Sequence, residues 1–279
     1  MAHRDLRWSL LARVARSTAL PAVAACLTLA LAAQPVVALP SSGDDPEPQQ
    51  QQGQRPGTTG GFAFGAPRGF FLIKGGIFVP RGDSDIYSFN EEQLTLDGNS
   101  FISGLFGIDV GWSLNERVDL VFGFEYSSAS PVSEFRDWVD EFDLPITQQT
   151  RLRTVPVTAS VRVNLVERGR AVGNYAWIPS GAVPYVGAGA AIMWWRYEQF
   201  GDFIDFTDLT IFTDYFQTEG WDPELHVFGG VDVSISPRFA LNFEARYGWA
   251  EGDLAPAFVG FQPIDLAGFR VTGGASFRF

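Results

Sequence analysis

The sequence contains very little cysteine and histidine. Among its 279 residues there is one cysteine, Cys26, and there are two histidines, His3 and His226. Cys26 and His3 both lie in an N-terminal stretch that we expect to be removed from the mature protein. The mature chain would then have no disulfide bond, no thiolate metal site and no cysteine nucleophile, and a single imidazole is too few for a zinc site.

Positive charge is also scarce. The chain has 20 Lys and Arg against 32 Asp and Glu, a net charge of −12. Removal of residues 1–38 takes away four basic residues and one acidic residue and leaves a net charge of −15. Because nucleic acids bind to basic surfaces, this balance argues against a nucleic-acid partner.

Only one long apolar run is present, from Ala19 to Ala33, and it follows a leader with four arginines. Small-residue cleavage patterns at 30–32 and 36–38 complete a secretory signal peptide, which we predict over residues 1–38. A retained helical anchor is one alternative, but the run is shorter than the roughly 20 apolar residues that such a helix needs. Lipidation of Cys26 is another, although the chain stays apolar after it up to Leu39. Any other membrane crossing must be made by strands.

Residues 39–68 differ abruptly in composition. They are rich in Pro, Gly, Gln, Ser and Thr, and they include the runs Gln49-Gln-Gln-Gln52 and Gly57-Thr-Thr-Gly-Gly61. Such a segment cannot bury a hydrophobic core, so we expect it to be disordered in the periplasm. It would serve as a tether or as a leader without specific binding.

From residue 69 to residue 279 apolar residues recur with a period of two, the pattern of β-strands. In the segment 106–112, for example, aromatic and aliphatic side chains at even positions alternate with two glycines and Asp109. Eight such segments are predicted at about 69–80, 106–112, 119–126, 151–165, 183–197, 224–235, 239–249 and 265–279. Eight is an even number, as a closed up-and-down bacterial barrel requires.

The connections between these segments alternate in length. Long links are expected at 81–99, 127–150, 198–223 and 250–264, and short turns at 114–117 and 236–238. Membrane barrels have short periplasmic turns and longer external loops, so the long links are expected to be external. The link at 166–182 is too long for a periplasmic turn, and its Tyr175 and Trp177 indicate packing at the inner rim.

The two faces of the predicted strands have opposite polarity. One face is almost purely aromatic and aliphatic, whereas the other carries a charged network for which we name Asp109, Glu125, Arg162, His226, Asp232, Glu244, Arg246 and Arg270. A soluble lipocalin-like barrel is apolar inside and polar outside, which would leave these charges buried without compensation or the apolar face in water. In a bilayer the apolar face meets lipid, where a charge would cost about 2–4 kcal/mol at mid-depth. We therefore predict an all-β fold, an eight-stranded antiparallel up-and-down transmembrane β-barrel over 69–279, with a plugged or very narrow lumen.

The C-terminus carries a more specific pattern. A polar residue, a glycine two positions later and aromatic residues at the third-last and last positions (Thr272, Gly274, Phe277 and Phe279) resemble the signal read by the outer-membrane assembly machinery. An amphipathic strand that happens to end in Phe is the alternative. We expect a multi-pass protein of the outer membrane with a periplasmic N-terminus, whose partners are the assembly machinery, outer-membrane lipid and lipopolysaccharide.

Three short segments carry a family resemblance. The segments 155–163 and 183–190 resemble the fourth and fifth strands of small OmpW- and OmpA-type barrels, and Gly75-Gly-Ile-Phe-Val-Pro80 is similar to their first strand. The resemblance covers about 69–279 and implies a role in envelope integrity or in the passage of small, apolar molecules. We expect no peptidoglycan-binding domain after the last strand, so the anchoring role of OmpA is not implied. The long link at 166–182 departs from the family.

Catalysis and cofactor binding have weak support. The glycines of Gly187-Ala-Gly-Ala-Ala-Ile192 are not followed by a helix, as a dinucleotide site requires, and no cofactor is expected. His226 lies near Glu224 and Asp232 and would act as a base, but no serine partner can be placed from the sequence. We therefore predict a lumenal hydrogen-bond network and no enzymatic activity, with an outer-membrane lipid hydrolase as an alternative.

The external links combine acidic and aromatic residues. The link at 198–223 contains seven carboxylates and seven aromatics. Six of the aromatics form a candidate ligand-contact loop: Phe203, Phe206, Phe212, Tyr215, Phe216 and Trp221. Packing of loop on loop is the main interpretation of these aromatics, and contact with an apolar ligand is the alternative. The carboxylates here and in 127–150 predict divalent cations as partners. A structural barrel for envelope integrity is the first functional hypothesis, and a narrow passive conduit for small apolar or neutral solutes is the second.

Overall fold

The structure is a computed structural model that describes residues 65–172, 176–205 and 208–279. The predicted signal peptide lies outside the described residues, as does almost all of the segment predicted to be disordered. No helix among the described residues is long and apolar enough to cross a membrane.

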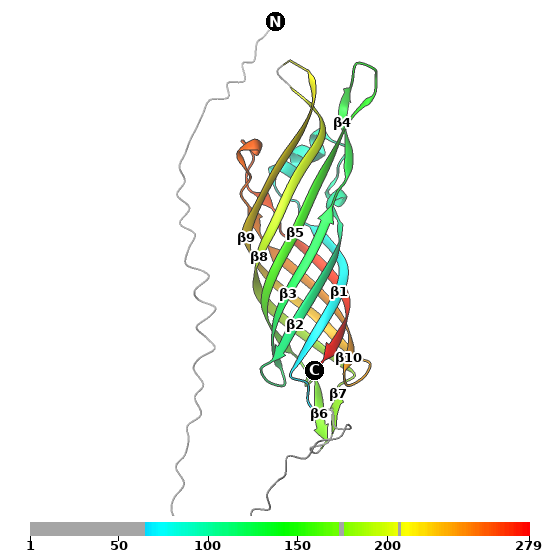
Figure 1. Ribbon diagram of the computed structural model, residues 1–279, viewed down its shortest axis with the longest axis vertical. Coiled ribbons are helices and arrows are strands. Elements are labelled where there is room, and N and C mark those ends of the chain that lie inside the picture. Colours follow the sequence, from blue (N-terminus) through cyan, green and yellow to red (C-terminus); the bar gives the residue numbers. More distant parts are fainter. Residues whose placement is uncertain (1–64, 173–175, 206–207) are drawn as a thin grey trace, which may run out of the picture. The chain divides into compact units, whose positions relative to one another are not determined.

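Eight antiparallel strands form a closed ring (Figure 1). β1 pairs with β2 on one side and with β13 on the other, so the last strand closes the ring on the first. The ring strands are β1 (Gly69–Pro80), β2 (Ser103–Ser113), β3 (Val118–Ala129), β5 (Pro145–Asn164), β8 (Ala182–Ile204), β9 (Ile211–Ser234), β10 (Phe239–Trp249) and β13 (Gly268–Arg278). The predicted eight-stranded up-and-down barrel is confirmed.

Short elements decorate both ends of the ring. At the end with the long links these are α1 (Asp85–Gln93), η1 (Gly98–Phe101), β4 (Val132–Val139), β11 (Glu251–Gly252), η2 (Pro256–Phe258) and β12 (Ile264–Asp265). At the end with the short turns they are β6 (Gly169–Val172) and β7 (Ala176–Pro179), seen at the bottom of Figure 1. Both Gly69 and Phe279 lie at this second end, where the Gly69 amide donates to the Phe279 carbonyl.

Two of the predicted external loops are in fact mostly strand. β8 and β9 continue through the link expected at 198–223 and pair as far as Ile204 and Ile211. In the link expected at 127–150, β4 pairs with the extended start of β5. The predicted ends of these strands were wrong because an antiparallel hairpin satisfies its own backbone hydrogen bonds, so the strands need not end where the apolar outer surface ends.

The long link at 166–182 forms the β6–β7 hairpin against the turn end of the barrel. Its Trp177 is buried, and the Arg278 guanidinium lies 5.9 Å from the centre of the Trp177 ring. Arg168, just before β6, donates to the Ser113 hydroxyl and to the backbone carbonyl of Asn115. The packing expected for Trp177 at the inner rim is therefore observed, whereas Tyr175 lies outside the described residues.

The polarity of the barrel is that of a membrane protein. Phe122 and Val161 on the outer wall are 45% and 46% exposed, whereas Glu125 and Arg246 inside are 3% exposed. On β5 the outward apolar side chains run from Val155 to Val163, a length within the roughly 9–11 residues that a tilted transmembrane strand needs. Water would not tolerate this outer wall, so the barrel spans a membrane.

Candidate functional site

Charged side chains in equal numbers of each sign fill the interior of the barrel from membrane depth to the end with the short turns. We call these twelve residues the lumen network: Lys74, Arg162, Arg168, Arg246, Arg270, Arg278, Asp109, Asp119, Glu125, Glu224, Asp232 and Glu244. The structure places inside the barrel all eight residues named from the sequence for this role, none of them more than 8% exposed. Six bases against six acids leave the network without formal net charge.

Lys74 of β1 lies at the centre of the network. Its Nζ atom is 2.8 Å from an oxygen of Asp109 on β2 and 2.7 Å from an oxygen of Glu125 on β3, and the lysine is 1% exposed. A buried ammonium is tolerated only when carboxylates compensate it, because its loss of hydration costs several kcal/mol. Lys74 was not named from the sequence. Lys74 is on the same face of β1 as Phe70 and Leu72, the face that points inward. The sequence does not reveal this, because β1 has apolar residues on both faces.

Two arginines on β10 and β13 extend the network. Arg246 on β10 is 2.8 Å from Glu244 and 3.3 Å from Glu125. Arg270 on β13 makes two parallel hydrogen bonds of 3.0 and 2.9 Å to Glu224 on β9. The paired geometry of guanidinium and carboxylate gives these bonds both strength and direction, so they hold β9, β10, β13 and β3 at fixed separations.

A second ionic layer lies nearer the short turns. The Arg162 guanidinium is 3.0 Å from Asp119 and 3.2 Å from Asp232, and it lies between the rings of Phe70 and Tyr185 at 4.5 and 4.6 Å from their centres. The guanidinium therefore forms ion pairs with two carboxylates and cation–π contacts with two aromatic rings. This layer therefore closes the lumen below Lys74.

Glycines provide the room that these groups need. A Cβ atom at Gly123 would lie 2.3 Å from an oxygen of Asp109, and one at Gly248 would lie 2.7 Å from an oxygen of Glu224. Both glycines face inward, as the sequence predicts. An eight-stranded barrel has an interior only wide enough for side chains, so ion pairs and glycines alternate around it.

His226 has a serine partner that the sequence did not reveal. Its Nε2 atom is 2.8 Å from the Ser160 hydroxyl on β5, and its Nδ1 atom is 3.6 Å from Glu224. The two residues meet across Gly189 of β8, and only the register of three strands brings them together. The order resembles that of a hydrolytic triad, but His226 and Ser160 are 1% and 3% exposed and Glu224 is bound by Arg270. The contact is therefore a hydrogen bond within the lumen network, not an accessible nucleophile.

Above the lumen network, at the end with the long links, the interior becomes apolar. We call this cluster the outer plug: Ile86, Tyr87, Leu94, Leu96, Phe101, Ala129, Phe135, Ile146, Leu152, Met193, Trp195, Tyr197, Ile204, Ala250, Phe258, Ile264 and Leu266. It combines strand residues that face inward with residues of α1, η1 and η2. It was not predicted from the sequence, because the links at 81–99 and 250–264 were expected only as long external links and no packing was assigned to them.

A polar contact fixes α1 inside the outer plug. Asn90 of α1 is fully buried, donates to the Tyr197 hydroxyl at 2.7 Å and accepts from the Gln199 amide at 3.0 Å. Burial raises the pKa of Tyr197 above its ordinary value, so the phenol stays protonated. Buried polar groups with satisfied partners fix one arrangement of a core, and α1 is therefore held across the mouth.

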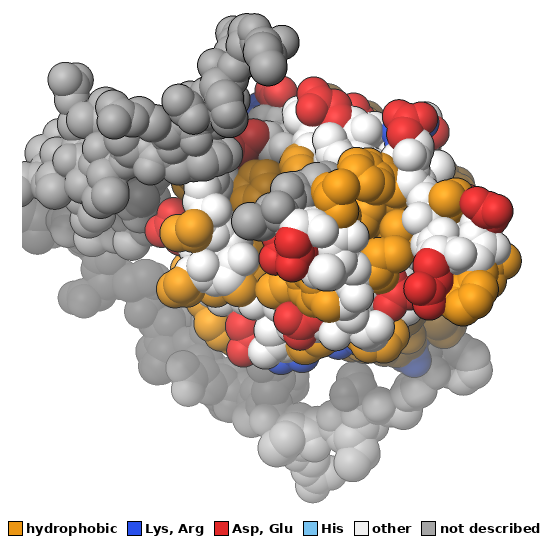
Figure 2. Space-filling view, turned by 90° about the horizontal axis from the view of Figure 1, so that it is seen from above, with side chains coloured by type: hydrophobic (Ala, Val, Ile, Leu, Met, Phe, Trp, Pro, Cys, Tyr) orange, Lys and Arg blue, Asp and Glu red, His pale blue; other side chains and the backbone are white. Residues whose placement is uncertain are grey.

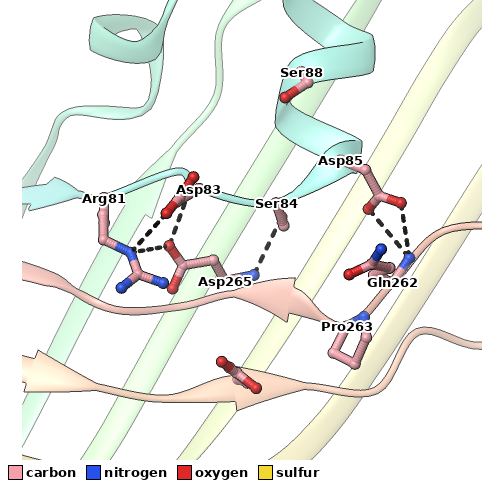
Figure 3. Close-up of a pocket in the computed structure, with 9 residues that line it drawn as sticks. Arg81, Asp83, Ser84, Asp85, Ser88, Gln262, Pro263 and Asp265 are labelled. Atoms are coloured by element: carbon pink, nitrogen blue, oxygen red, sulfur yellow. Dashed lines mark hydrogen bonds and ion pairs between the residues drawn. The ribbon is translucent and has the colours of Figure 1, made fainter.

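A groove on the surface joins the first and last external links (Figure 3). Arg81 donates to Asp265 at 2.8 Å, and Asp85 at the start of α1 accepts from the backbone N–H of Gln262. The groove has a volume of about 330 Å³. These contacts fasten the first and last links together at the rim. In the part of the chain that the structure describes, no group of three or more His, Cys, Asp or Glu could hold a metal ion, so cation binding at the acidic links stays a prediction.

The candidate ligand-contact residues do not form one site. Phe203 lies 5.9 Å from Phe212 and 4.9 Å from Phe216, measured between ring centres, so these three pack on one another within the β8–β9 hairpin. Tyr215 and Trp221 are exposed on the outer wall, Tyr215 with its hydroxyl on Glu198. Phe206 lies outside the described residues. The packed trio agrees with the interpretation of loop-on-loop packing.

The residues of the C-terminal pattern lie on both faces of β13. Thr272 and Gly274 face the lumen, whereas Phe277 and Phe279 are exposed on the outer wall at the turn end. The Phe277 ring packs against Phe239 at 5.3 Å. This alternation leaves the two aromatics on the lipid side, and the recognition of this pattern by the assembly machinery stays a prediction.

A closed antiparallel barrel with an apolar wall and an ionic interior is a specific combination. Bacterial outer-membrane proteins have this architecture, with short turns at one end and long extensions at the other. The chain is an outer-membrane β-barrel protein.

Comparisons with known proteins agree with this fold. No protein-family model and no curated protein matches the chain. The chain is similar to the solved structure of Neisserial surface protein A, with 12% identity over 75% of this chain and 97% of that one and a TM-score of 0.42. It is also similar to OprG of Pseudomonas aeruginosa, with 14% identity over 77% and 98% and a TM-score of 0.42, and to Ail of Yersinia pestis, with 15% identity over 76% and 99% and a TM-score of 0.41. The barrel fold that the resemblance in the sequence implied is the fold that the structure shows.

Proposed function

We propose that the protein is a closed structural barrel that contributes to the integrity of the outer membrane and does not conduct solutes. The filling of the interior in two chemically different layers carries this proposal. The lumen network occupies the barrel at membrane depth with mutually neutralising side chains, and the outer plug covers it with apolar ones.

A conduit would have to displace both layers. A charged or polar solute would need to cross the outer plug, and an apolar solute would need to pass Lys74, Asp109 and Glu125, where the Lys74 ammonium is within 3 Å of both carboxylates. Separating buried ion pairs costs several kcal/mol, and moving a polar group through an apolar cluster carries a cost of the same order. The contact of 3.3 Å between Glu125 on β3 and Arg246 on β10 holds opposite walls of the barrel together, which suits a structural role.

The test is solute flux into liposomes that contain the purified protein. We expect the uptake of glycine, of a pentose and of indole to equal that of empty vesicles, while vesicles with an open porin take up all three. Uptake of any of them above the empty-vesicle rate would replace the structural role by the conduit. Deletion of the gene in its host should in addition increase the entry of large antibiotics and sensitivity to detergent. An unchanged barrier would contradict the integrity role.

A further inference from the structure

Three arginines form a compact group on the outer wall of the barrel, just beyond the apolar band. We call Arg151 and Arg153 of β5 and Arg196 of β8 the arginine cluster. Arg153 and Arg196 are direct partners across the two strands. Like charges at directly opposite positions of a sheet repel each other and destabilise it. The sheet therefore carries a cost here that an anionic ligand would remove.

The carboxylates nearby compensate the arginine cluster only in part. Glu198 is shared by all three, at 3.6 Å from Arg151 and Arg153 and 3.8 Å from Arg196, and these distances are too long for hydrogen bonds. Arg196 also pairs with Glu219. Three guanidinium groups thus face two carboxylates.

Several N–H donors of the arginine cluster have no hydrogen-bond acceptor among the described residues. Among the described residues Arg153 donates no hydrogen bond, and Arg151 donates one, to the Ser130 hydroxyl at 3.1 Å. The three side chains are 28–36% exposed, so the free N–H groups point to a surface that a ligand can reach. Each guanidinium presents its donors in a planar fork that matches the oxygens of a phosphate.

The cluster lies at the depth of lipid headgroups. On β5 the outward apolar side chains begin at Val155, two residues after Arg153, and Val155 pairs with Trp194 on β8. Trp194 pairs with the exposed Trp221 on β9, and the Arg196 guanidinium is 5.2 Å from the centre of the Trp194 ring. Tryptophan marks the boundary between hydrocarbon and headgroups. The arginines lie just beyond this boundary, toward the long extensions.

The rest of this end of the barrel repels anions. Figure 2 shows it from above, with many acidic side chains and very few basic ones. Apart from the cluster, the described residues of the extensions contain two basic side chains, and both are engaged: Arg81 with Asp265, and Arg136 with the backbone carbonyl of Leu94. An anionic headgroup therefore finds unoccupied positive charge at the arginine cluster.

A cavity next to the cluster gives the headgroup space. It has a volume of about 200 Å³ and is lined by Gln149, Arg151, Glu198, Phe200 and Tyr215. Arg151 thus belongs both to the cluster and to the cavity wall. A sugar or glycerol that carries the phosphate would lie here against polar and aromatic side chains.

We propose that the arginine cluster binds the phosphate of a lipid headgroup in the outer leaflet, with the phosphorylated glycolipid of that leaflet as the occupant. The proposal rests on the proposed function in one respect, the outward placement of the long extensions. The acyl chains would lie along Val155, Val157 and Ile192, which are on the same wall below the cluster.

Native mass spectrometry of the full barrel in an uncharged detergent tests this. The probes are diphosphorylated lipid A, the same lipid after enzymatic removal of its phosphates, and inorganic phosphate. The variants are Arg151→Gln/Arg153→Gln and the control Arg117→Gln, which removes an exposed arginine at the turn end. Unboiled gels check that each variant is folded.

We expect one lipid A molecule to bind the wild type and the Arg117→Gln control equally, and the double variant to bind it about tenfold more weakly or worse. Dephosphorylated lipid and inorganic phosphate should bind weakly to all three proteins. Equal binding of lipid A by the double variant and the wild type would overturn the proposal. Full displacement of lipid A by millimolar phosphate would assign the site to the free ion instead. The flux measurement does not depend on either result, so the two proposals fail separately.

Discussion

Replacement of Lys74 by Met should lower the free energy of unfolding of the barrel by about 3–5 kcal/mol, the usual cost of removing one partner from a buried ion network. The methionine fits the space of the lysine but leaves Asp109 and Glu125 without their shared cation. Both carboxylates are almost fully buried, so water cannot replace the ammonium. Urea titration of the protein in lipid vesicles, followed by tryptophan fluorescence, measures the change.

Two further variants make this prediction specific. Ile73→Met changes the neighbouring residue, which faces lipid and is 47% exposed, and should cost less than about 1 kcal/mol. The double variant Lys74→Met/Glu125→Gln removes one charge of each sign and should recover part of the loss. If Lys74→Met were no more harmful than Ile73→Met, the ion pairs would not hold the barrel together.

Arginine in place of Phe122 should be the most harmful change on the outer wall. Phe122 lies midway along the outward face of β3, and its ring packs against Trp112 with centres 5.9 Å apart. An arginine at the bilayer midplane of a barrel costs about 2–4 kcal/mol, and loss of the aromatic contact adds to this. The same unfolding measurement in vesicles reports the cost.

A substitution near the membrane surface provides the control for Phe122→Arg. Ile235 is equally apolar and 66% exposed, but it lies at the short turn after β9. Ile235→Arg should cost about 0–1 kcal/mol, because an arginine near the interface reaches water and headgroups. Equal costs at the two positions would show that the wall at Phe122 does not contact hydrocarbon.

Local periodicity was sufficient to predict the strands and their faces. The bounds of β1 and β10 coincide with the predicted segments 69–80 and 239–249. The inward positions of Glu125 and Arg246 followed from alternation alone, since side chains on a strand alternate between two faces. Most strands have a polar face and an apolar face, and a membrane is the solvent that accepts this arrangement with the apolar face outward.

Contacts across strands could not be predicted in the same way. Ser160 meets His226 only because β8 sets the register between β5 and β9, and a shift of one residue would separate them. Arg168 enters the network from a link whose fold no periodicity reveals. The outer plug was missed for a related reason, because α1 gains its place from the Asn90 contact and not from a helical pattern in the sequence.

The central claim is that the apolar wall meets lipid while the ionised side chains are enclosed. The most direct test is electron paramagnetic resonance of nitroxide labels at Phe122→Cys, Val161→Cys and Leu114→Cys, each in a chain with Cys26 replaced by Ala and reconstituted in vesicles. Leu114 lies in a short turn and is 65% exposed. We predict that labels at 122 and 161 collide mainly with oxygen, which concentrates in hydrocarbon, and that the label at 114 collides mainly with a water-soluble nickel chelate. Frequent collisions of the labels at 122 and 161 with the nickel chelate would contradict the account.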